Sequence, residues 1–381
     1  MILAGTYAVT VAGFYAVVAW RTRAGDPDTL ATSVPDVGLF PGVSIILPAR
    51  NEQRNIRDCV ETLLAQDYPD YEVIVVNDGS DDDTGRILSE VAAEHAQRER
   101  LRVLSVESLP PGWAGKPHAL QTGAAAATGE WLLFTDADTR HERAALRSAV
   151  ASAVARSADL LTLGTQQDTP DFWSRVLMPF AYMGIGMMYP LRKVGDPNSP
   201  VAIANGQFIL IRRGTYDAVG GYASPSLRGS IVDDRDLAAV VKRIGGRIAL
   251  VDGRDLVHVR MYHTLAEHWE GWGKNAFAGS RGGLPFYALM LIGLPTACIA
   301  PFALMLALPV LRRRDVAMAG VPAVAATLLY RAKLNRDLGV PLRYIWTHPL
   351  AAAIFTGILA RSAWRVLTRQ GVTWRGRTYQ V

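Results

Sequence analysis

The feature that most constrains this fold is the alternation of short apolar runs with longer amphipathic stretches between Val43 and Val257. "VSIILPA", "YEVIVV" and "EWLLFT" have the length and composition of strands. Residues 54–66, between the first two, repeat apolar side chains at helical spacing. Strands that alternate with helices predict an α/β fold, in which a mostly parallel sheet carries helices on both faces.

Three acidic groups stand at comparable places in this pattern. "NDGSDDDT" follows the strand "YEVIVV", "DADT" follows "EWLLFT", and "VDDRDL" opens a later helix. Ligands bind at the carboxyl ends of strands in open parallel sheets, so Asp136 and Asp138 stand where a ligand is expected. Two carboxylates one residue apart are suited to a hard divalent cation, Mn²⁺ or Mg²⁺, that bridges a diphosphate.

The first and third acidic groups also have a purely structural interpretation. Asp78 and the acids at 81–83 could form a solvated turn and a helix N-terminus, where carboxylates interact favourably with the helix dipole. Asp233 could cap the helix that it opens. The functional interpretation takes one acid of the Asp233-Asp234 pair as a general base, with a pKa that desolvation brings towards the working pH.

Four segments, in order, resemble the family 2 glycosyltransferases, which have the GT-A (Rossmann-like) fold: "ILPARNEQRNI", "VIVVNDGSDDDT", "LLFTDADT" and "VDDRDLAAVVKRIGGRIAL". The resemblance implies an inverting transfer from a nucleotide-sugar donor, UDP-glucose or a relative. It implies that Glu52 and Asp78 hold the base and ribose, that Asp136 and Asp138 bind donor and metal, and that Asp234 is the base. Further donor contacts are implied at Pro48, Ala49, Arg50 and Ala137. The family usually has Glu-Asp where this chain has Asp-Asp, and the second position carries the base role.

"PPGWAGKPHAL" resembles a membrane-bound subgroup that acts on lipids and includes bacterial carotenoid-type, hopanoid-associated and ceramide glycosyltransferases. Gly115 permits a tight turn, and Lys116 at a helix N-terminus could meet the donor diphosphate or the base. The alternative for Lys116 is a surface lysine beside a packed tryptophan. "RMYHTLAEHWEGWGKNAFAG" and the closing "WRGRTY" also resemble this subgroup. The resemblance implies acceptor or other site roles for Asp233, Arg260, Trp272, Lys274, Trp374, Arg375 and Arg377.

Processive polysaccharide synthases of the family carry Gln-x-x-Arg-Trp where this chain has His268 to Trp272, and only the tryptophan matches. This difference favours the transfer of a single sugar. Trp272 could form a wall of the acceptor site or be a core tryptophan.

The first 20 residues carry no charge, would span about 30 Å as a helix, and precede Arg21 and Arg23. They predict an uncleaved anchor with the following residues in the cytoplasm. Three more uncharged runs, at 284–311, 316–330 and 344–360, precede an arginine-rich tail. A cytoplasmic tail requires an even number of crossings after the catalytic domain, so one of the three runs would have to be re-entrant.

The segment 171–194 is apolar and rich in methionine. We expect it to lie in the membrane interface, where it would admit a lipid acceptor, and the alternative is a buried helix of the domain. The predicted organisation is an anchor (1–20), a linker (21–41), a cytoplasmic GT-A domain (42–280) that includes 171–194, a membrane region (281–367) and a cytoplasmic tail (368–381). These segments predict a multi-pass protein of the bacterial inner membrane.

Composition narrows the class of partner. Hydrophobic residues make up 50% of the chain, the net charge is +5, and no basic stripe is interleaved with aromatics, so we expect a lipid bilayer and no nucleic acid. Cys59 and Cys298 are far apart and are expected to be reduced thiols. Two alternatives remain open, a polyprenyl-phosphate acceptor and a non-catalytic lipid-binding scaffold. The sequence predicts no oligomeric state.

Overall fold

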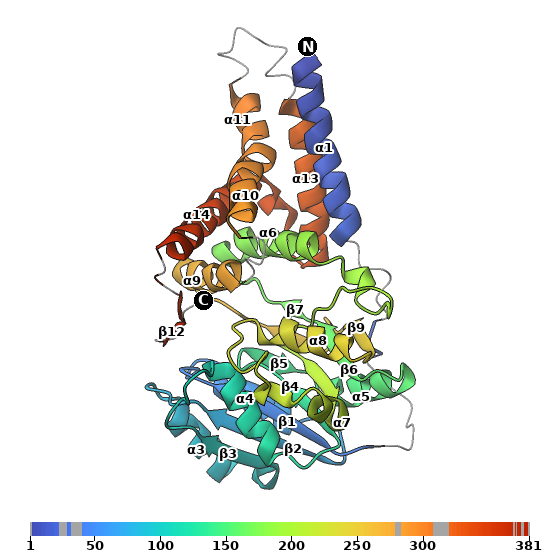
Figure 1. Cartoon of the computed structure of the whole chain (residues 1–381), viewed down its shortest axis with the longest axis vertical. Helices are drawn as coiled ribbons and strands as arrows, with labels where there is room; N and C mark the ends of the chain where they lie inside the picture. Colours follow the sequence, from blue (N-terminus) through green and yellow to red (C-terminus); the bar gives the residue numbers. More distant parts are fainter. Residues whose placement is uncertain are drawn as a thin grey trace. The chain divides into compact units, whose positions relative to one another are not determined.

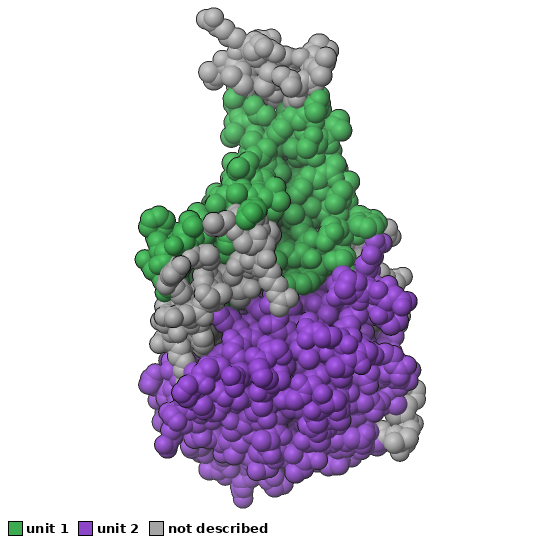
Figure 2. Space-filling view, in the orientation of Figure 1, with its two compact units in different colours: residues 1–24, 169–190, 262–381 green, residues 25–168, 191–261 purple. Residues whose placement is uncertain are grey.

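A computed structural model describes residues 2–22, 29–31, 40–278, 283–307, 320–368, 370, 372–374 and 377–379. The chain divides into two compact units, which Figure 2 colours separately. Unit 1 comprises Met1–Ala24, Thr169–Pro190 and Tyr262–Val381, and unit 2 comprises Gly25–Asp168 and Leu191–Met261. Two segments that the sequence assigns to the catalytic domain, 171–190 and 262–280, therefore group with the helices of unit 1.

Unit 2 contains a seven-stranded sheet in the order β3-β2-β1-β4-β8-β6-β9. Its strands are β1 (Val43–Ala49), β2 (Tyr71–Asn77), β3 (Leu101–Ser105), β4 (Trp131–Phe134), β6 (Leu160–Gly164), β8 (Ile209–Arg212) and β9 (Ile248–Asp252). Neighbouring strands are parallel except at β8, which runs antiparallel to both β4 and β6. The predicted mostly parallel α/β sheet is confirmed.

Helices cover both faces of this sheet (Figure 1). They are α2 (Ile56–Leu64), α3 (Thr84–Glu94), α4 (Gly115–Ala126), α5 (Ala145–Ala155), α7 (Arg213–Ala218) and α8 (Asp233–Arg243), with 3₁₀ turns η1 (Arg98–Arg100), η2 (Leu191–Lys193) and η3 (Gly221–Ala223). Because side chains alternate along a strand, Ile45 and Leu47 join the core under α2 and α5, whereas Ile46 joins the core under α4 and α8. A Cβ on Gly123 of α4 would lie 2.5 Å from the Ile46 side chain, so this glycine lets α4 approach the sheet closely.

A smaller sheet in unit 2 joins β5 (Thr139–His141), β10 (Val257–Val259) and β7 (Gln166–Gln167). β10 pairs antiparallel with β5 and parallel with β7. The next residue after β10, Arg260, donates its backbone N–H to the carbonyl oxygen of Asp138 at 3.2 Å. This sheet therefore brings Arg260 beside the "DADT" segment.

Unit 1 is mainly helical. It contains α1 (Ile2–Thr22), α6 (Phe172–Met188), α9 (Leu265–Ala278), α10 (Gly283–Cys298), α11 (Ala300–Leu306), α13 (Gly320–Asp337), η4 (Leu342–Thr347), α14 (His348–Leu367) and a hairpin of β11 (Val372–Trp374) and β12 (Arg377–Tyr379). α6 lies across α1 and α13 (Figure 1), with Val176, Phe180 and Met183 in the shared core. Only its ends, Phe172 and Met188, expose large apolar side chains. The burial of α6 agrees with the buried-helix alternative rather than with a helix lying on a membrane surface.

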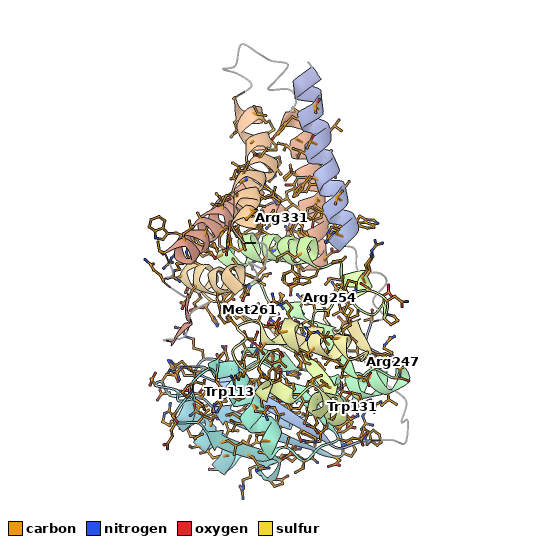
Figure 3. All side chains as sticks on the ribbon, viewed as in Figure 1. Trp113, Trp131, Arg247, Arg254, Met261 and Arg331 are labelled. Atoms are coloured by element: carbon orange, nitrogen blue, oxygen red, sulfur yellow. The ribbon has the colours of Figure 1, made fainter. Side chains whose placement is uncertain are left out.

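Pro179 interrupts the hydrogen bonds of α6, because proline has no N–H to donate to the carbonyl of Arg175 four residues earlier. Arg331 of α13, labelled in Figure 3, compensates for this loss. Its Nη2 donates to the carbonyl oxygens of Arg175 at 2.9 Å and Val176 at 3.0 Å, and its Nε donates to Asn335 at 2.8 Å. A fully buried guanidinium thus ties α13 to the proline position of α6.

Among the described residues, one stretch, Tyr287–Leu306, is long and apolar enough to cross a membrane. It comprises most of α10 together with α11. Large apolar side chains of unit 1 are more than 60% exposed at Val9, Leu289, Ile292, Leu306 and Leu329. Residues 308–319, which join two of the predicted membrane runs, lie outside the described residues.

Candidate active site

Three of the sequence motifs meet in unit 2. Lys116 lies in the first turn of α4, Asp136 follows β4, and Asp233 begins α8. The Lys116 Nζ lies 2.7 Å from Asp136 Oδ1 and 3.6 Å from Asp233 Oδ2. The predicted helix N-terminus at Lys116 is confirmed, and the lysine stands among the acids rather than on an isolated surface.

Gly206, in the loop before β8, completes this cluster. Its backbone N–H donates to Asp234 Oδ2 at 3.1 Å. A Cβ at this position would lie 3.1 Å from Lys116 Nζ and 3.4 Å from Oδ2 of both Asp136 and Asp234. The missing side chain therefore leaves a small cradle that is lined by one cation and two carboxylates.

Buried amides hold the loop that carries Gly206. The Asn205 side-chain amide donates to the carbonyl of Leu163 at 2.9 Å, which ties the loop to β6. The Gln207 side-chain oxygen accepts hydrogen bonds from the Thr165 hydroxyl at 2.5 Å and the Gln167 amide at 3.0 Å. These hydrogen bonds hold the loop on both sides of Gly206, so its N–H is directed towards Asp234.

The pKa values of Lys116 and Tyr222 are shifted by burial and by the neighbouring carboxylates. Burial by itself lowers the pKa of Lys116, but the carboxylates of Asp136, Asp233 and Asp234 raise it by more, so its pKa lies above the ordinary value. Burial, together with the negative charge of Asp233, also raises the pKa of the Tyr222 phenol. Lys116 is therefore charged and Tyr222 neutral at any physiological pH.

The capping interpretation of Asp233 does not describe this helix. The residue before α8 is Val232, with no side-chain cap, and Asp233 instead contacts Lys116. Asp234 Oδ1 accepts the N–H of Arg235 at 2.7 Å, while Oδ2 accepts that of Gly206. Asp234 is thus fixed by two backbone donors, in an orientation that turns one oxygen to the cradle.

Side chains of Thr139 and Cys59 contact the backbone of the "DADT" segment. The Thr139 hydroxyl donates to the Asp136 carbonyl at 2.7 Å, and the Cys59 thiol lies 3.7 Å from the same oxygen. Burial raises the pKa of the Cys59 thiol to about 12, so this cysteine is unreactive. Ala137, between the two acids, is 2% exposed. As predicted, both Cys59 and Cys298 are free.

The residues implied in nucleotide binding lie where β1 and β2 end side by side. Pro48 and Ala49 pair with Val76 and Asn77. Arg50 Nη1 donates to the carbonyls of Asp78 at 2.5 Å and Gly79 at 2.9 Å, which holds the loop after β2. Glu52 and Asp78 are buried, with 8% and 4% exposed. This end of the sheet is therefore a rigid floor built by the first two motifs.

The donor atoms suit a divalent cation, although the protein alone does not complete a site. Within the described part of the chain, no group of three or more His, Cys, Asp or Glu side chains could hold a metal ion. Asp136 and Asp138 supply hard carboxylate oxygens, and the cradle at Gly206 gives room beside Asp136. Mg²⁺ and similar ions are commonly held by one or two carboxylates plus substrate phosphates, so these residues fit a cation completed by a diphosphate.

Arg260 has a property that the sequence could not reveal. Its Nε is buried and makes no hydrogen bond to any residue that the structure describes. Buried donors normally have a partner, so this atom is available to a ligand or to water. Gly206 and Tyr222 are site residues that sequence reasoning missed. "ANGQF" signals a turn before a strand, but nothing in the sequence links that turn to the acids.

The other predicted acceptor residues lie in unit 1. Trp272 is 7% exposed and packs against the rings of Tyr262 and Phe355, as a core residue does. Lys274 is half-buried on α9. Arg375 lies outside the described residues, as do the side chains of Trp374 and Arg377 in the β11–β12 hairpin.

A mostly parallel α/β sheet with acids at the carboxyl ends of its strands has the architecture of a GT-A transferase. The fold is similar to that of a mannosyltransferase from Pyrobaculum calidifontis, solved in complex with GDP-Man and Mn²⁺. That likeness has a TM-score of 0.57 at 20% identity and covers 95% of this chain and 99% of that chain. Residues 44–220 match the family model Glycosyl transferase family 2, and the chain is an enzyme that is similar to this family over that segment.

Relatives with assigned activities extend the similarity beyond that domain. The chain is 27% identical over 351 residues to 4,4'-diaponeurosporenoate glycosyltransferase of Staphylococcus aureus strain USA300, which covers 89% of this chain and 88% of the relative. The enzyme of the same description from strain MRSA252 is 26% identical over 348 residues. The predicted resemblance to carotenoid-type glycosyltransferases is therefore confirmed.

Proposed function

We propose that this enzyme transfers one sugar, with inversion, from a nucleotide-sugar donor to a lipid acceptor at the cytoplasmic face of the membrane. The observation that carries the proposal is the meeting of Lys116, Asp136 and Asp234 around Gly206. This cluster combines a cation for a diphosphate with a carboxylate fixed for proton transfer. Similarity to an enzyme named for a carotenoid acid supports a lipid acceptor.

The donor is a UDP-sugar, UDP-glucose or a relative. Glu52 and Asp78 hold the base and ribose, beside Pro48, Ala49 and Arg50 at the end of β1. Asp136 and Asp138 would hold Mn²⁺ or Mg²⁺, which when bound would supply positive charge that stabilises the leaving diphosphate. Lys116 contacts a diphosphate oxygen from the N-terminus of α4, where the helix dipole also favours an anion.

Asp234 is the base when the acceptor is an alcohol. Its carboxylate takes the hydroxyl proton while the acceptor oxygen bonds to the anomeric carbon and the bond to the diphosphate breaks. A carboxylic acid acceptor is already ionised at neutral pH and needs no base. In that case Arg260 orients the acceptor carboxylate through its buried Nε.

We further propose that unit 1 attaches the enzyme to the bacterial inner membrane. Its exposed apolar side chains and the stretch Tyr287–Leu306 support this attachment. The basic residues Arg21 and Arg23 support a cytoplasmic catalytic domain. Multi-pass topology, with α1 as the anchor and a C-terminal membrane region, is part of the same proposal.

The donor is tested by calorimetric titration of UDP-glucose, UDP-GlcNAc and GDP-mannose into purified protein, with Mn²⁺ or with chelator. We expect tightest binding of a UDP-sugar with metal present. Asp138→Asn should weaken binding only in the presence of metal, because a charged ligand becomes neutral. The exposed Asp217 of α7 gives the matched control Asp217→Asn. Equal donor affinity and turnover in chelator would remove the metal from the proposal.

The acceptor is tested by supplying the enzyme and radiolabelled donor with a terpenoid alcohol, a terpenoid carboxylic acid or a polyprenyl phosphate, followed by mass spectrometry of the product. We expect a glycoside or glycosyl ester that contains one sugar. Preferred use of the polyprenyl phosphate would replace the proposed acceptor by the alternative left open by the sequence.

A further inference from the structure

A hollow of about 500 Å³ lies between α9 and α14 within unit 1. α9 contributes Trp269, Glu270 and Gly273 to its wall, and α14 contributes Ile358, Arg361 and Arg365. None of these residues belongs to the candidate active site in unit 2. The hollow therefore calls for a separate explanation.

The walls are fixed by close packing. A Cβ on Gly357 of α14 would lie 2.7 Å from the Trp269 ring, so the glycine allows the indole to lie directly on the helix. Beneath Arg361, the Ser362 hydroxyl lies 3.0 Å from the hydroxyl of Tyr287 on α10. Ile358 is 1% exposed. The hollow is thus bounded by closely packed residues of α9, α10 and α14.

Two arginines line this hollow. Arg361 and Arg365 are one helical turn apart and therefore lie on one side of α14. Within the described ranges, neither guanidinium forms a hydrogen bond or an ion pair, and the Glu270 carboxylate on the opposite wall bridges to neither. Two guanidinium groups beside the Trp269 ring match a ligand that joins an anion to a hydrocarbon chain.

Exposed apolar side chains near the hollow indicate that such a ligand would be a membrane lipid. On the same end of α14, Trp364 is 62% exposed and Leu367 is 59% exposed. α10, which packs beside α14, exposes Leu289 and Ile292. Tryptophan and arginine at the end of an apolar helix are typical of the membrane interface, where basic pockets between helices bind lipid head groups.

We propose that the hollow between α9 and α14 binds the phosphodiester head group of an anionic membrane lipid such as phosphatidylglycerol. Arg361 and Arg365 contact the phosphate oxygens, and the Trp269 ring contacts the glycerol and the first acyl carbons. Glu270 accepts a hydrogen bond from a head-group hydroxyl. This inference rests on the proposed membrane attachment of unit 1, but on neither the donor nor the chemistry of the active site.

The test uses full-length protein in neutral detergent with equal amounts of phosphatidylglycerol and phosphatidylcholine, and native mass spectrometry counts the retained lipid. We expect preferential retention of phosphatidylglycerol by the wild type. Retention should fall about tenfold in R361Q/R365Q, since two charge-assisted contacts are lost. Arg336 of α13, whose guanidinium is also without a hydrogen bond or ion pair in the described structure, gives the control R336Q, which should retain the lipid normally.

Two further experiments distinguish a lipid phosphate from free phosphate and control for misfolding of the variant. Excess inorganic phosphate should not displace the lipid, and complete displacement would identify a free-anion site and overturn the lipid assignment. R361K/R365K keeps both charges and should keep most of the lipid if the Gln variant unfolds. Wild-type retention by R361Q/R365Q, or equal loss in R336Q, would also overturn it. Titration of the nucleotide-sugar donor into the same samples tests the proposed function separately. If the donor does not bind, the lipid result is unchanged.

Discussion

At the residue scale, the site depends on Lys116. The carboxylates of Asp136, Asp233 and Asp234 lie close together and would repel one another, and the partly buried ammonium of Lys116 offsets this repulsion before any donor arrives. The same positive charge can bind a diphosphate. Lys116 therefore holds the acids together in the free enzyme and is placed to contact the donor. Asp234 differs from the other acids because two backbone donors fix its direction.

The roles of the acids can be separated with Asp234→Asn. This change keeps the shape of the side chain but removes its ability to accept a proton at neutral pH. With an alcohol acceptor, kcat should fall by about 10² to 10⁴ while the donor Kd changes little. With a carboxylic acid acceptor the loss should be much smaller.

Asp217→Asn is the control for this measurement, together with a thermal melt that verifies folding. Near-normal kcat of the Asp234 variant on an alcohol would rule out its role as the base.

A second residue-scale prediction concerns His141 of β5, whose Nε2 lies within hydrogen-bond distance of the hydroxyls of Thr135 and Thr139. Burial lowers its pKa to about 3, whereas an exposed histidine titrates near 6.5. Below about pH 6.5 the His141 imidazole takes up a proton in the unfolded chain but stays neutral in the folded chain. The free energy of unfolding therefore decreases by up to about 1.4 kcal/mol per pH unit as the pH falls.

His141→Gln removes this titration. The melting temperature of the wild type should fall more steeply than that of the variant between about pH 6.5 and pH 5. Parallel melting curves for the two proteins would show that His141 is not held neutral by the fold.

At the element scale, α6 shows how a sequence irregularity is compensated from another part of the chain. Pro179 leaves the Arg175 carbonyl without its helical donor, and Arg331 of α13 supplies one. A buried arginine is costly to desolvate, so its three hydrogen bonds are needed to offset that cost. α6 and α13 are therefore expected to lose stability together.

This coupling is measurable with a double-mutant cycle. Arg331→Leu should destabilise the protein by about 1 to 3 kcal/mol, since buried carbonyls lose their donor. Pro179→Ala restores a backbone N–H that can donate to the Arg175 carbonyl, so in that background the Arg331 change should cost less. The readout is the shift in melting temperature in detergent for the two single variants and the double variant. Strictly additive shifts would mean that Arg331 does not compensate for Pro179.

At the scale of the whole molecule, the two units use apolar residues differently. Unit 2 encloses them in two cores on either side of its sheet. Unit 1 has a core of its own and also exposes large apolar side chains such as Leu289, Ile292 and Leu329. In water such a surface would favour aggregation, which supports the proposed attachment of unit 1 to a membrane.

Membrane fractionation tests this difference. The full-length protein should stay in the membrane pellet after washes with high salt and alkaline carbonate, and detergent should release it. Salt alone weakens electrostatic attachment, whereas apolar insertion resists it. Release by high salt would contradict an apolar attachment and leave only surface charges to hold the enzyme.

The sequence by itself determined the α/β architecture, because strand and helix periodicities are local properties of the chain. It also singled out Asp136, Asp138 and Asp234, because the position of an acid relative to a strand end or helix start can be read locally. The implied roles of these acids and of Glu52 and Asp78 remain predictions until the variants are measured.

Tertiary structure decided what depends on contacts between distant segments. Gly206 lies among the acids because β8 inserts between β4 and β6, a pairing that no local pattern encodes. Likewise, α6 is buried because α1, α13 and α14, from both ends of the chain, surround it. Apolar helices that face lipid and those that face protein have the same composition, so only the packing partners distinguish them.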